Sequence, residues 1–304
     1  MTSRRLRLVS WYFRTVIKAR VKHVGDPLEV RARFETMSRR AQKAPPYSVK
    51  RHGAMGGVPV LWVASGPVQN PEVVFYIHGG GFILGSPETH YHVVAKLCRL
   101  LKCEAVMPRY RLAPEHPFPA GLNDVLAAYE ALVASGREPS RIVVMGDSAG
   151  GCLTMALIAH LNQTGQPMPR AAVPISPVLD LRGVSDSIRD NAAKEAVLVA
   201  ERFQELMDMY LEDHSREDPL ASPYLADFAA LPPTHFHVSA DEILRDDTLN
   251  MVDKLKAAGH AVTVRMWDTS FHVFHLMRGY VPDADAALRD IAEFIRGLRR
   301  SADS

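Results

Sequence analysis

The chain has 304 residues, of which 47% are hydrophobic and 23% charged, a balance typical of globular proteins. This length allows one large α/β domain with insertions, or at most two small domains. Three cysteines cannot form a disulfide framework, no Cys/His spacing resembles a zinc site, and no apolar run reaches the roughly 18 residues that span a bilayer. We therefore expect no metal, no cofactor, no transmembrane segment and a reducing, cytoplasmic compartment.

The net charge of +2 is distributed unevenly, because residues 1–51 contain 14 Lys or Arg and only 3 Asp or Glu. Apolar residues recur there at helical spacing and predict an amphipathic helix: Leu6, Val9, Phe13, Val16 and Ile17. The helix either packs on the body of the protein with its charges in solvent, or contacts a membrane surface. We expect no nucleic-acid partner, since the N-terminal charge is its only support.

Further along the chain, short apolar runs alternate with helical patterns. Strands are predicted at 58–63, 73–77, 104–108, 142–145, 171–175, 234–238 and 262–266, and helices near 90–101, 122–135, 149–162, 249–258 and 284–298. This alternation predicts an α/β fold with a mostly parallel central sheet flanked by helices. Residues 182–223 interrupt the order with charged, helix-favouring sequence. We expect a main domain over 51–304, and a helical cap built from residues 1–50 and the inserted residues 182–223.

Two glycine-rich segments each follow a predicted strand. The first is His78-Gly79-Gly80-Gly81-Phe82, and the second, Gly146–Gly150, fits the G-x-S-x-G pattern in which a serine lies on a sharp strand-to-helix turn. The first can direct backbone N–H groups at a developing oxyanion. Together they predict acyl transfer with Ser148 as the nucleophile. We expect His78 to brace its loop rather than to act as a base.

A serine nucleophile needs a base, and the base needs an acid that orients it. His272 follows the last predicted strand and is the favoured base, whereas His275 is expected to start a helix or lie in the core. Asp241 is the first acid after the strand at 234–238 and is the favoured partner of His272. Glu242 is the main alternative, and residues 246–247 are expected to begin the next helix.

These motifs, with Tyr110–Ala120 (YRLAPEHPFPA), resemble the bacterial hormone-sensitive-lipase-like carboxylesterases of the α/β-hydrolase fold, over about residues 55–300. The resemblance implies Ser148, His272 and Asp241 as the catalytic triad. It also implies a two-part cap and an oxyanion hole formed by the backbone N–H groups of Gly80, Gly81 and Ala149. One departure is Val273, where the family often has glycine.

The resemblance further implies hydrolysis of short- to medium-chain acyl esters through an acyl-enzyme intermediate, and a homodimer as one option for assembly. A lactone hydrolase or an amidase using the same triad is the alternative. A non-catalytic binding protein on the same scaffold is disfavoured because His272 is present. Four residues are expected either to line the substrate pocket or, for the last three, to pack inside the cap: Phe82, Phe203, Met207 and Tyr210.

Overall fold

An eight-stranded sheet forms the centre of the computed structural model, which describes residues 2–18 and 25–302. The strand order is β1-β2-β4-β3-β5-β6-β7-β8, with β1 and β2 antiparallel to their neighbours and the remaining pairs parallel. The strands are β1 (Ser48–Met55), β2 (Val58–Ser65), β3 (Val73–Ile77), β4 (Glu104–Pro108), β5 (Ile142–Asp147), β6 (Ala171–Ile175), β7 (Thr234–Ser239) and β8 (Val262–Trp267). The predicted α/β fold with a mostly parallel sheet is confirmed.

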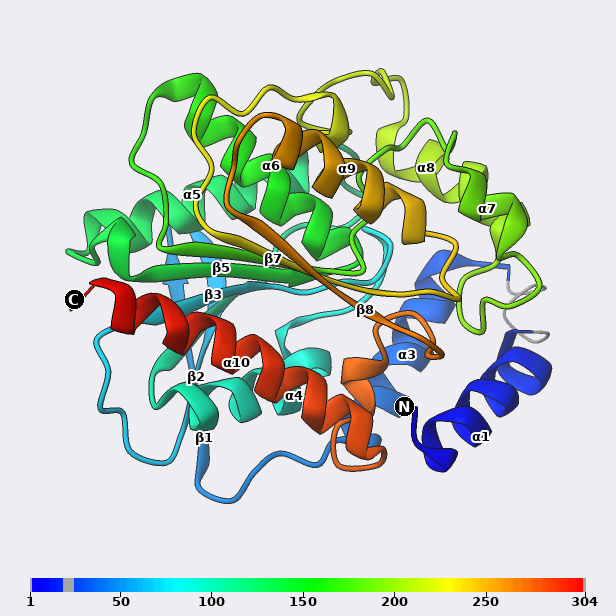
Figure 1. Cartoon of the computed structure of the whole chain (residues 1–304), viewed down its shortest axis with the longest axis horizontal. Helices are drawn as coiled ribbons and strands as arrows, with labels where there is room; N and C mark the ends of the chain where they lie inside the picture. Colours follow the sequence, from blue (N-terminus) through cyan, green and yellow to red (C-terminus); the bar gives the residue numbers. More distant parts are fainter. Residues whose placement is uncertain (1, 19–24, 303–304) are drawn as a thin grey trace.

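Helices cover both faces of this sheet (Figure 1). One face carries α5 (Ala120–Ala134), α6 (Ala149–Thr164) and α9 (Arg245–Ala257), and the other carries α4 (Pro87–Leu101) and α10 (Pro282–Ala302). The described ranges also contain α1 (Arg4–Tyr12), α3 (Pro27–Ala41), α7 (Asp186–Asp190) and α8 (Phe203–Leu211). Short helical turns are η1 (Phe13–Ile17), η2 (Pro139–Arg141), η3 (Ala200–Arg202), η4 (Pro223–Leu225) and η5 (Phe274–Met277).

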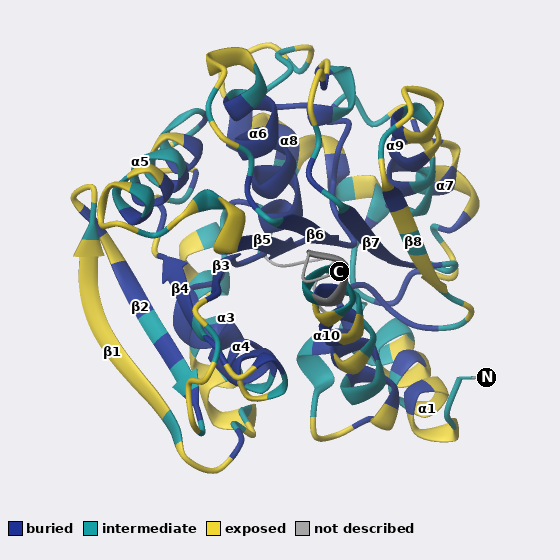
Figure 2. Cartoon of the chain, turned by 60° about the vertical axis from the view of Figure 1, so that its left-hand side comes forward, coloured by how far each residue is buried: buried dark blue, intermediate teal, exposed yellow. Residues whose placement is uncertain are grey.

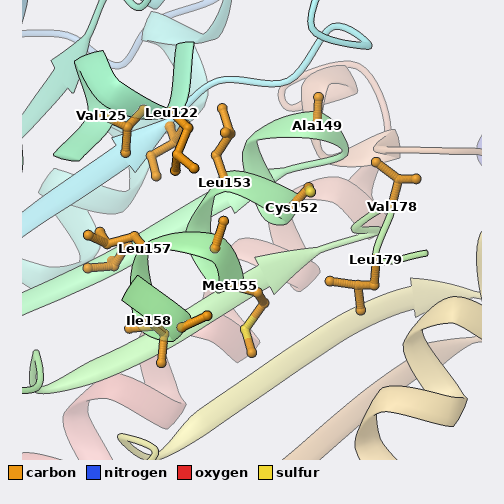
Figure 3. Close-up of a cluster of buried hydrophobic side chains, with 14 of the residues drawn as sticks. Leu122, Val125, Ala149, Cys152, Leu153, Met155, Leu157, Ile158, Val178 and Leu179 are labelled. Carbon is orange, nitrogen blue, oxygen red and sulfur yellow. The ribbon is translucent and has the colours of Figure 1, made fainter. Parts of the chain in front are cut away.

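The central strands and α6 form the most deeply buried part of the molecule. All five residues of β3 and all six of β5 are buried, as parallel strands covered on both faces must be. Figure 3 shows α6 contributing Cys152, Leu153, Met155, Leu157 and Ile158 to the surrounding core. Each fully buried Leu or Ile side chain is worth about 1.5–3 kcal/mol. Helix α6 is therefore held rigidly, and so is the turn that precedes it.

Two elements, β1 and α3, were not predicted from the sequence patterns. Strand β1 lies at the sheet edge, and its six central residues are exposed (Figure 2), so it carries no apolar alternation. Helix α3 has no buried residue. The sheet therefore begins at Ser48, within the segment 1–50 that was expected to belong wholly to the cap.

The N-terminal helices and the inserted segment lie at the same end of the sheet (Figure 1). Lys18 Nζ donates hydrogen bonds to the carbonyl oxygens of Ala192 and Glu195, and Arg14 donates one to that of Lys194. These contacts support the proposal that residues 1–50 and 182–223 form a two-part cap, although residues 1 and 19–24 of that segment lie outside the described residues. Within the described ranges, every helix is too short or too polar to cross a bilayer.

Candidate active site

Ser148 lies on a sharp turn between β5 and α6, where its backbone adopts φ +53° and ψ −119°. Such a conformation is costly for a residue with a side chain and persists only where the surroundings enforce it. A Cβ at Gly146 or Gly150 would approach the carbonyl oxygen of Ile77 closer than 3.0 Å. Both positions therefore require glycine, since strand β3 passes directly against the turn. The turn presents Ser148 Oγ at the end of the sheet.

His272 connects the serine to a buried carboxylate. Its Nε2 lies 2.8 Å from Ser148 Oγ, and its Nδ1 lies 2.8 Å from Glu242 Oε2. A carboxylate can only accept hydrogen bonds, so Nδ1 carries the proton and the Nε2 lone pair accepts from the serine hydroxyl. Burial on its own lowers the pKa of His272, but the hydrogen bond and charge of Glu242 outweigh it and the pKa is raised above its ordinary value. The imidazolium form is thus stabilised.

The acid that contacts His272 is Glu242, so the assignment of this position to Asp241 is wrong. Glu242 is buried, and its other oxygen, Oε1, accepts hydrogen bonds from Ser176 Oγ and from the backbone N–H of Ser239, both at 2.8 Å. Asp241 is only partly buried, and the bond that involves it here joins its backbone N–H to Ser239 Oγ at 3.3 Å. Burial raises the pKa of the Asp241 carboxyl.

A tight turn at the end of β7 explains the choice. The backbone N–H of Glu242 donates to the carbonyl oxygen of Ser239, which turns the chain back on the strand end after three residues. The side chain at position 242 therefore returns toward β7 and the neighbouring β6, and the longer glutamate spans the remaining gap to His272. The sequence argument placed the first acid after the strand at the top of the sheet, but it did not anticipate this reversal.

Two buried residues of the inserted segment hold this turn, and sequence reasoning missed both. Asn191 Nδ2 donates to the carbonyl oxygens of Ala240 and Glu242, each at 2.9 Å. Glu195 accepts from the backbone N–H of Ile243 at 3.3 Å and, through its other oxygen, from that of Val197 at 2.8 Å. Burial raises the pKa of Glu195. No local pattern marks either residue, because their partners lie about fifty positions away.

The glycine loop after β3 approaches the serine turn through Asp147. Asp147 Oδ1 accepts hydrogen bonds from the backbone N–H of Gly79 at 3.2 Å and from the Tyr76 hydroxyl at 2.8 Å. His90 Nε2 lies 3.3 Å from the other oxygen. The residue before the nucleophile therefore positions the glycine loop directly, which links the two sequence motifs.

The expected oxyanion-hole residues come directly after Gly79 in the glycine loop and after Ser148 in the serine turn. Gly80 and Gly81 have φ of +126° and +59°, and Ala149 is the first residue of α6. In the described part of the chain, the backbone N–H groups of all three are without an acceptor among the loop and side-chain hydrogen bonds. The first N–H groups of a helix have no intrahelical partner. These donors are therefore available to a ligand.

His78 braces the glycine loop, as expected. It is buried, its Nδ1 lies 2.9 Å from the Gly79 carbonyl oxygen, and its ring stacks on Tyr110 with centroids 4.3 Å apart. Burial lowers the pKa of His78 to about 3, so the ring is neutral. His275, the alternative base, is buried in η5 away from Ser148, with its Nε2 3.2 Å from His237 Nδ1.

The four candidates for the substrate pocket are all buried within one core cluster. The Phe82 ring stacks on Tyr210 with centroids 3.6 Å apart, and Phe118 meets Tyr210 edge-on. Phe203 and Met207 lie on the same buried side of α8. Leu206, which sequence reasoning missed, is only partly buried, and its Cδ2 lies 2.9 Å from where a Cβ on Gly81 would be. Leu206 therefore packs against Gly81, beside the contact between Tyr210 and Phe82.

Val273, directly after the histidine, adopts the left-handed conformation at φ +49° and ψ +42°. A β-branched residue is rarely found there, since its side chain crowds the backbone. Glycine, which is frequent at this position in the resembled family, adopts such angles without cost. The departure noted in the sequence is thus a site of backbone strain adjoining His272.

Comparison with known proteins places this geometry in a family. A family model described as the alpha/beta hydrolase fold matches residues 74–276. An esterase of Acinetobacter venetianus is 36% identical over 228 residues, 75% of each chain. An acetyl-hydrolase of Streptomyces hygroscopicus is 35% identical over 228 residues, 75% of this chain and 76% of that one.

A crystal structure of an esterase from the bacterial hormone-sensitive lipase family is also similar, with a TM-score of 0.92 and 33% sequence identity. The match covers 98% of this chain and 99% of that chain. The likeness therefore extends beyond the serine motif to the whole arrangement of sheet, helices and N-terminal segment. The chain belongs to the α/β-hydrolase family, in its bacterial hormone-sensitive-lipase-like branch.

Proposed function

We propose that this protein is a serine carboxylesterase in which Ser148, His272 and Glu242 form the catalytic triad. The observation that carries the proposal is the position of His272, whose two ring nitrogens each lie 2.8 Å from a partner, Ser148 Oγ on one side and Glu242 Oε2 on the other. This arrangement is the one that makes a serine hydroxyl nucleophilic at neutral pH.

In the first step, Ser148 Oγ attacks the ester carbonyl carbon while His272 Nε2 takes the hydroxyl proton. The resulting imidazolium is stabilised by Glu242, whose negative charge faces Nδ1. The tetrahedral oxyanion accepts hydrogen bonds from the N–H groups of Gly80, Gly81 and Ala149, and each such donor is worth about 3–4 kcal/mol. His272 then protonates the departing alcohol, which leaves an acyl group on Ser148.

In the second step, His272 Nε2 takes a proton from a water molecule as that water attacks the acyl carbon. Collapse of the second tetrahedral intermediate returns the proton to Ser148 Oγ and releases the carboxylic acid. The two oxygens of the buried Glu242 accept from His272, Ser176 and Ser239, so this residue holds the His272 ring in place in both steps.

The proposed substrates are esters with short acyl chains. Leu206 packs close to Gly81, and Phe82 of the glycine loop stacks on Tyr210, so these side chains are the ones expected to limit the acyl chain. The acetyl-hydrolase among the relatives agrees with this size. Lactones and amides are the alternative substrates, because the same triad can open either bond.

Replacement of the nucleophile tests the proposal. Ser148→Ala should lower kcat for p-nitrophenyl acetate by about six orders of magnitude, to the background rate. Circular dichroism and the melting temperature should stay at wild-type values. Retention of more than about one per cent of the activity by a folded variant would refute the assignment. Parallel rates on acetyl esters, lactones and anilides distinguish the ester hydrolase from the alternatives.

We also propose that α1 docks the protein on an anionic bilayer surface. Leu8, Trp11 and Tyr12 are 65%, 54% and 45% exposed and, at spacings of three and four residues, form one stripe along the helix. The exposed Arg4, Arg5 and Arg7 lie around this stripe, and residues 1–25 contain no acid. Leu6 and Ser10 face the body of the protein. Apolar and aromatic residues bordered by arginines are typical of interfacial helices.

Co-sedimentation with lipid vesicles tests this docking. Wild type should bind phosphatidylcholine vesicles that contain phosphatidylglycerol, bind pure phosphatidylcholine less, and dissociate in high salt. The double variant Leu8→Ser/Trp11→Ser should lose this binding, whereas Val68→Ser, an exposed valine far from α1, should retain it. Equal sedimentation of wild type and the double variant would contradict the proposal. So would a double variant that binds vesicles as wild type does but no longer self-associates.

A further inference from the structure

Three ligand-type side chains meet on the sheet face opposite α6, away from Ser148. His235 and His237 alternate along β7 and so point to the same face, where α10 presents Asp290. His235 Nε2 lies 2.9 Å from Asp290 Oδ2, His237 Nε2 lies 3.0 Å from the same oxygen, and the two Nε2 atoms are 3.1 Å apart. His237 is wholly buried, and the Asp290 side chain is 31% exposed.

The nearly equilateral triangle fits a cation better than hydrogen bonds alone. Two N–H donors would have to reach one oxygen at an angle of about 60°, with their hydrogens crowded together and only one lone pair well aimed. For metal–ligand bonds of about 2.1 Å, neighbouring ligand atoms in an octahedral site are ~3.0 Å apart, against ~3.4 Å in a tetrahedral one. The three distances match one face of an octahedron.

The outer nitrogens of both rings also have partners. His235 Nδ1 lies 2.7 Å from Thr263 Oγ1, and His237 Nδ1 lies 3.2 Å from His275 Nε2. The Trp267 indole N–H, which can only donate, points at His237 Nδ1 from a longer 3.4 Å. Histidines that bind metals usually donate their second N–H to an acceptor, which leaves Nε2 free. Thr263 Oγ1 can accept from His235, and His275 Nε2, the nearer partner, can accept from His237.

The donor set of the cluster suits a divalent ion. Two imidazole nitrogens and one carboxylate oxygen favour first-row transition metals over magnesium or calcium. The partial exposure of Asp290 leaves room for water as the remaining ligands.

We propose that His235 Nε2, His237 Nε2 and Asp290 Oδ2 bind one divalent transition-metal ion, such as Ni²⁺, Co²⁺ or Zn²⁺, and that this ion joins β7 to α10. The sequence did not predict this site, because closely spaced cysteines and histidines are the usual signal and Asp290 lies 53 residues from His237. The ion would act on stability, because it would tie β7 to α10.

Metal titration of tag-free, chelator-treated protein tests the site. Calorimetry with NiCl₂ and ZnCl₂ should show one ion per chain, and the melting temperature should rise with ion concentration. Asp290→Asn keeps the size of the side chain and removes its charge, so it should weaken binding at least tenfold. Asp253→Asn, an exposed acid on α9, makes the same change of charge elsewhere and should bind as wild type does.

His235→Gln provides a second variant and should show the same loss as Asp290→Asn, with folding of both checked by circular dichroism. Equal affinity in wild type, Asp290→Asn and Asp253→Asn would overturn the proposal. So would the lack of any bound ion or change in melting temperature at millimolar metal, which would leave a purely hydrogen-bonded cluster.

Discussion

Glu242 and His272 form a buried hydrogen-bonded pair at the end of the sheet, with Oε2 of the carboxylate 2.8 Å from Nδ1 of the ring. The other oxygen of Glu242 is held by Ser176 and Ser239. The carboxylate is thus positioned by β6 and β7 independently of the histidine, and it orients the ring toward Ser148 before any substrate binds.

The two adjacent acids should differ sharply in their effect on catalysis. Glu242→Gln removes the charge behind His272 and offers an amide N–H₂ that can select the wrong tautomer, so kcat should fall by up to about 10⁴-fold. Asp241→Asn changes the same charge one residue earlier, and kcat for p-nitrophenyl acetate should stay within a few-fold of wild type. The opposite order of effects would restore Asp241 as the acid.

The pH profile should report the raised pKa of His272. The base must be neutral, so kcat/KM falls as the pH drops through the His272 pKa, and this fall should be centred above the ordinary histidine value. In Glu242→Gln, burial is the main influence on the pKa of His272 and lowers it. The residual activity should then persist to lower pH. If the fall in kcat/KM at low pH occurs at the same pH in Glu242→Gln as in wild type, Glu242 does not raise the pKa of His272.

The hydrogen bonds from Asn191 should affect turnover more than substrate binding. Asn191→Ala removes the side-chain donor shared by the carbonyl oxygens of Ala240 and Glu242, which should cost about 1–3 kcal/mol of unfolding free energy. The loosened turn should lower kcat with little change in KM. Asn123→Ala, an exposed asparagine on α5, is the matched control and should match wild type in both measurements.

Leu206 and Met207 are neighbours on α8 with different surroundings. Leu206→Ala should open space beside Gly81 and shift the preference from acetyl toward butyryl and hexanoyl esters, at nearly unchanged stability. Met207→Ala creates a cavity in the core and should lose about 2–5 kcal/mol without that shift. Acyl-chain profiles and urea unfolding of both variants check this contrast between substrate contact and core packing. An acyl-chain profile altered by Met207→Ala alone would show that Met207, not Leu206, contacts the acyl chain.

The glycine after the nucleophile should tolerate no side chain. Gly150→Ala would push a Cβ into the Ile77 carbonyl oxygen, so we expect a loss of more than about 4 kcal/mol or failure to fold. Gly297→Ala, inside α10 with open space around the added Cβ, should instead stabilise by about 0.5–1 kcal/mol. Thermal unfolding of the two variants measures both effects.

The amino-acid sequence by itself determined seven of the eight strands, the helices that cover the sheet, the serine turn and the glycine loop. These features depend on local causes, namely apolar periodicity and backbone conformations that only glycine allows. The identity of the histidine was also readable, because His272 follows the last strand closely.

Tertiary structure decided which acid serves His272, which side of α8 meets the glycine loop, and how His235, His237 and Asp290 come together. Each of these depends on the path of the chain after a strand or on contacts between residues far apart in sequence. Asp241 and Glu242 are both acids directly after the same strand, and only the turn at Ser239 and the hydroxyl of Ser176, just after β6, distinguish them. Periodicity carries no information about such contacts, because it describes one element at a time.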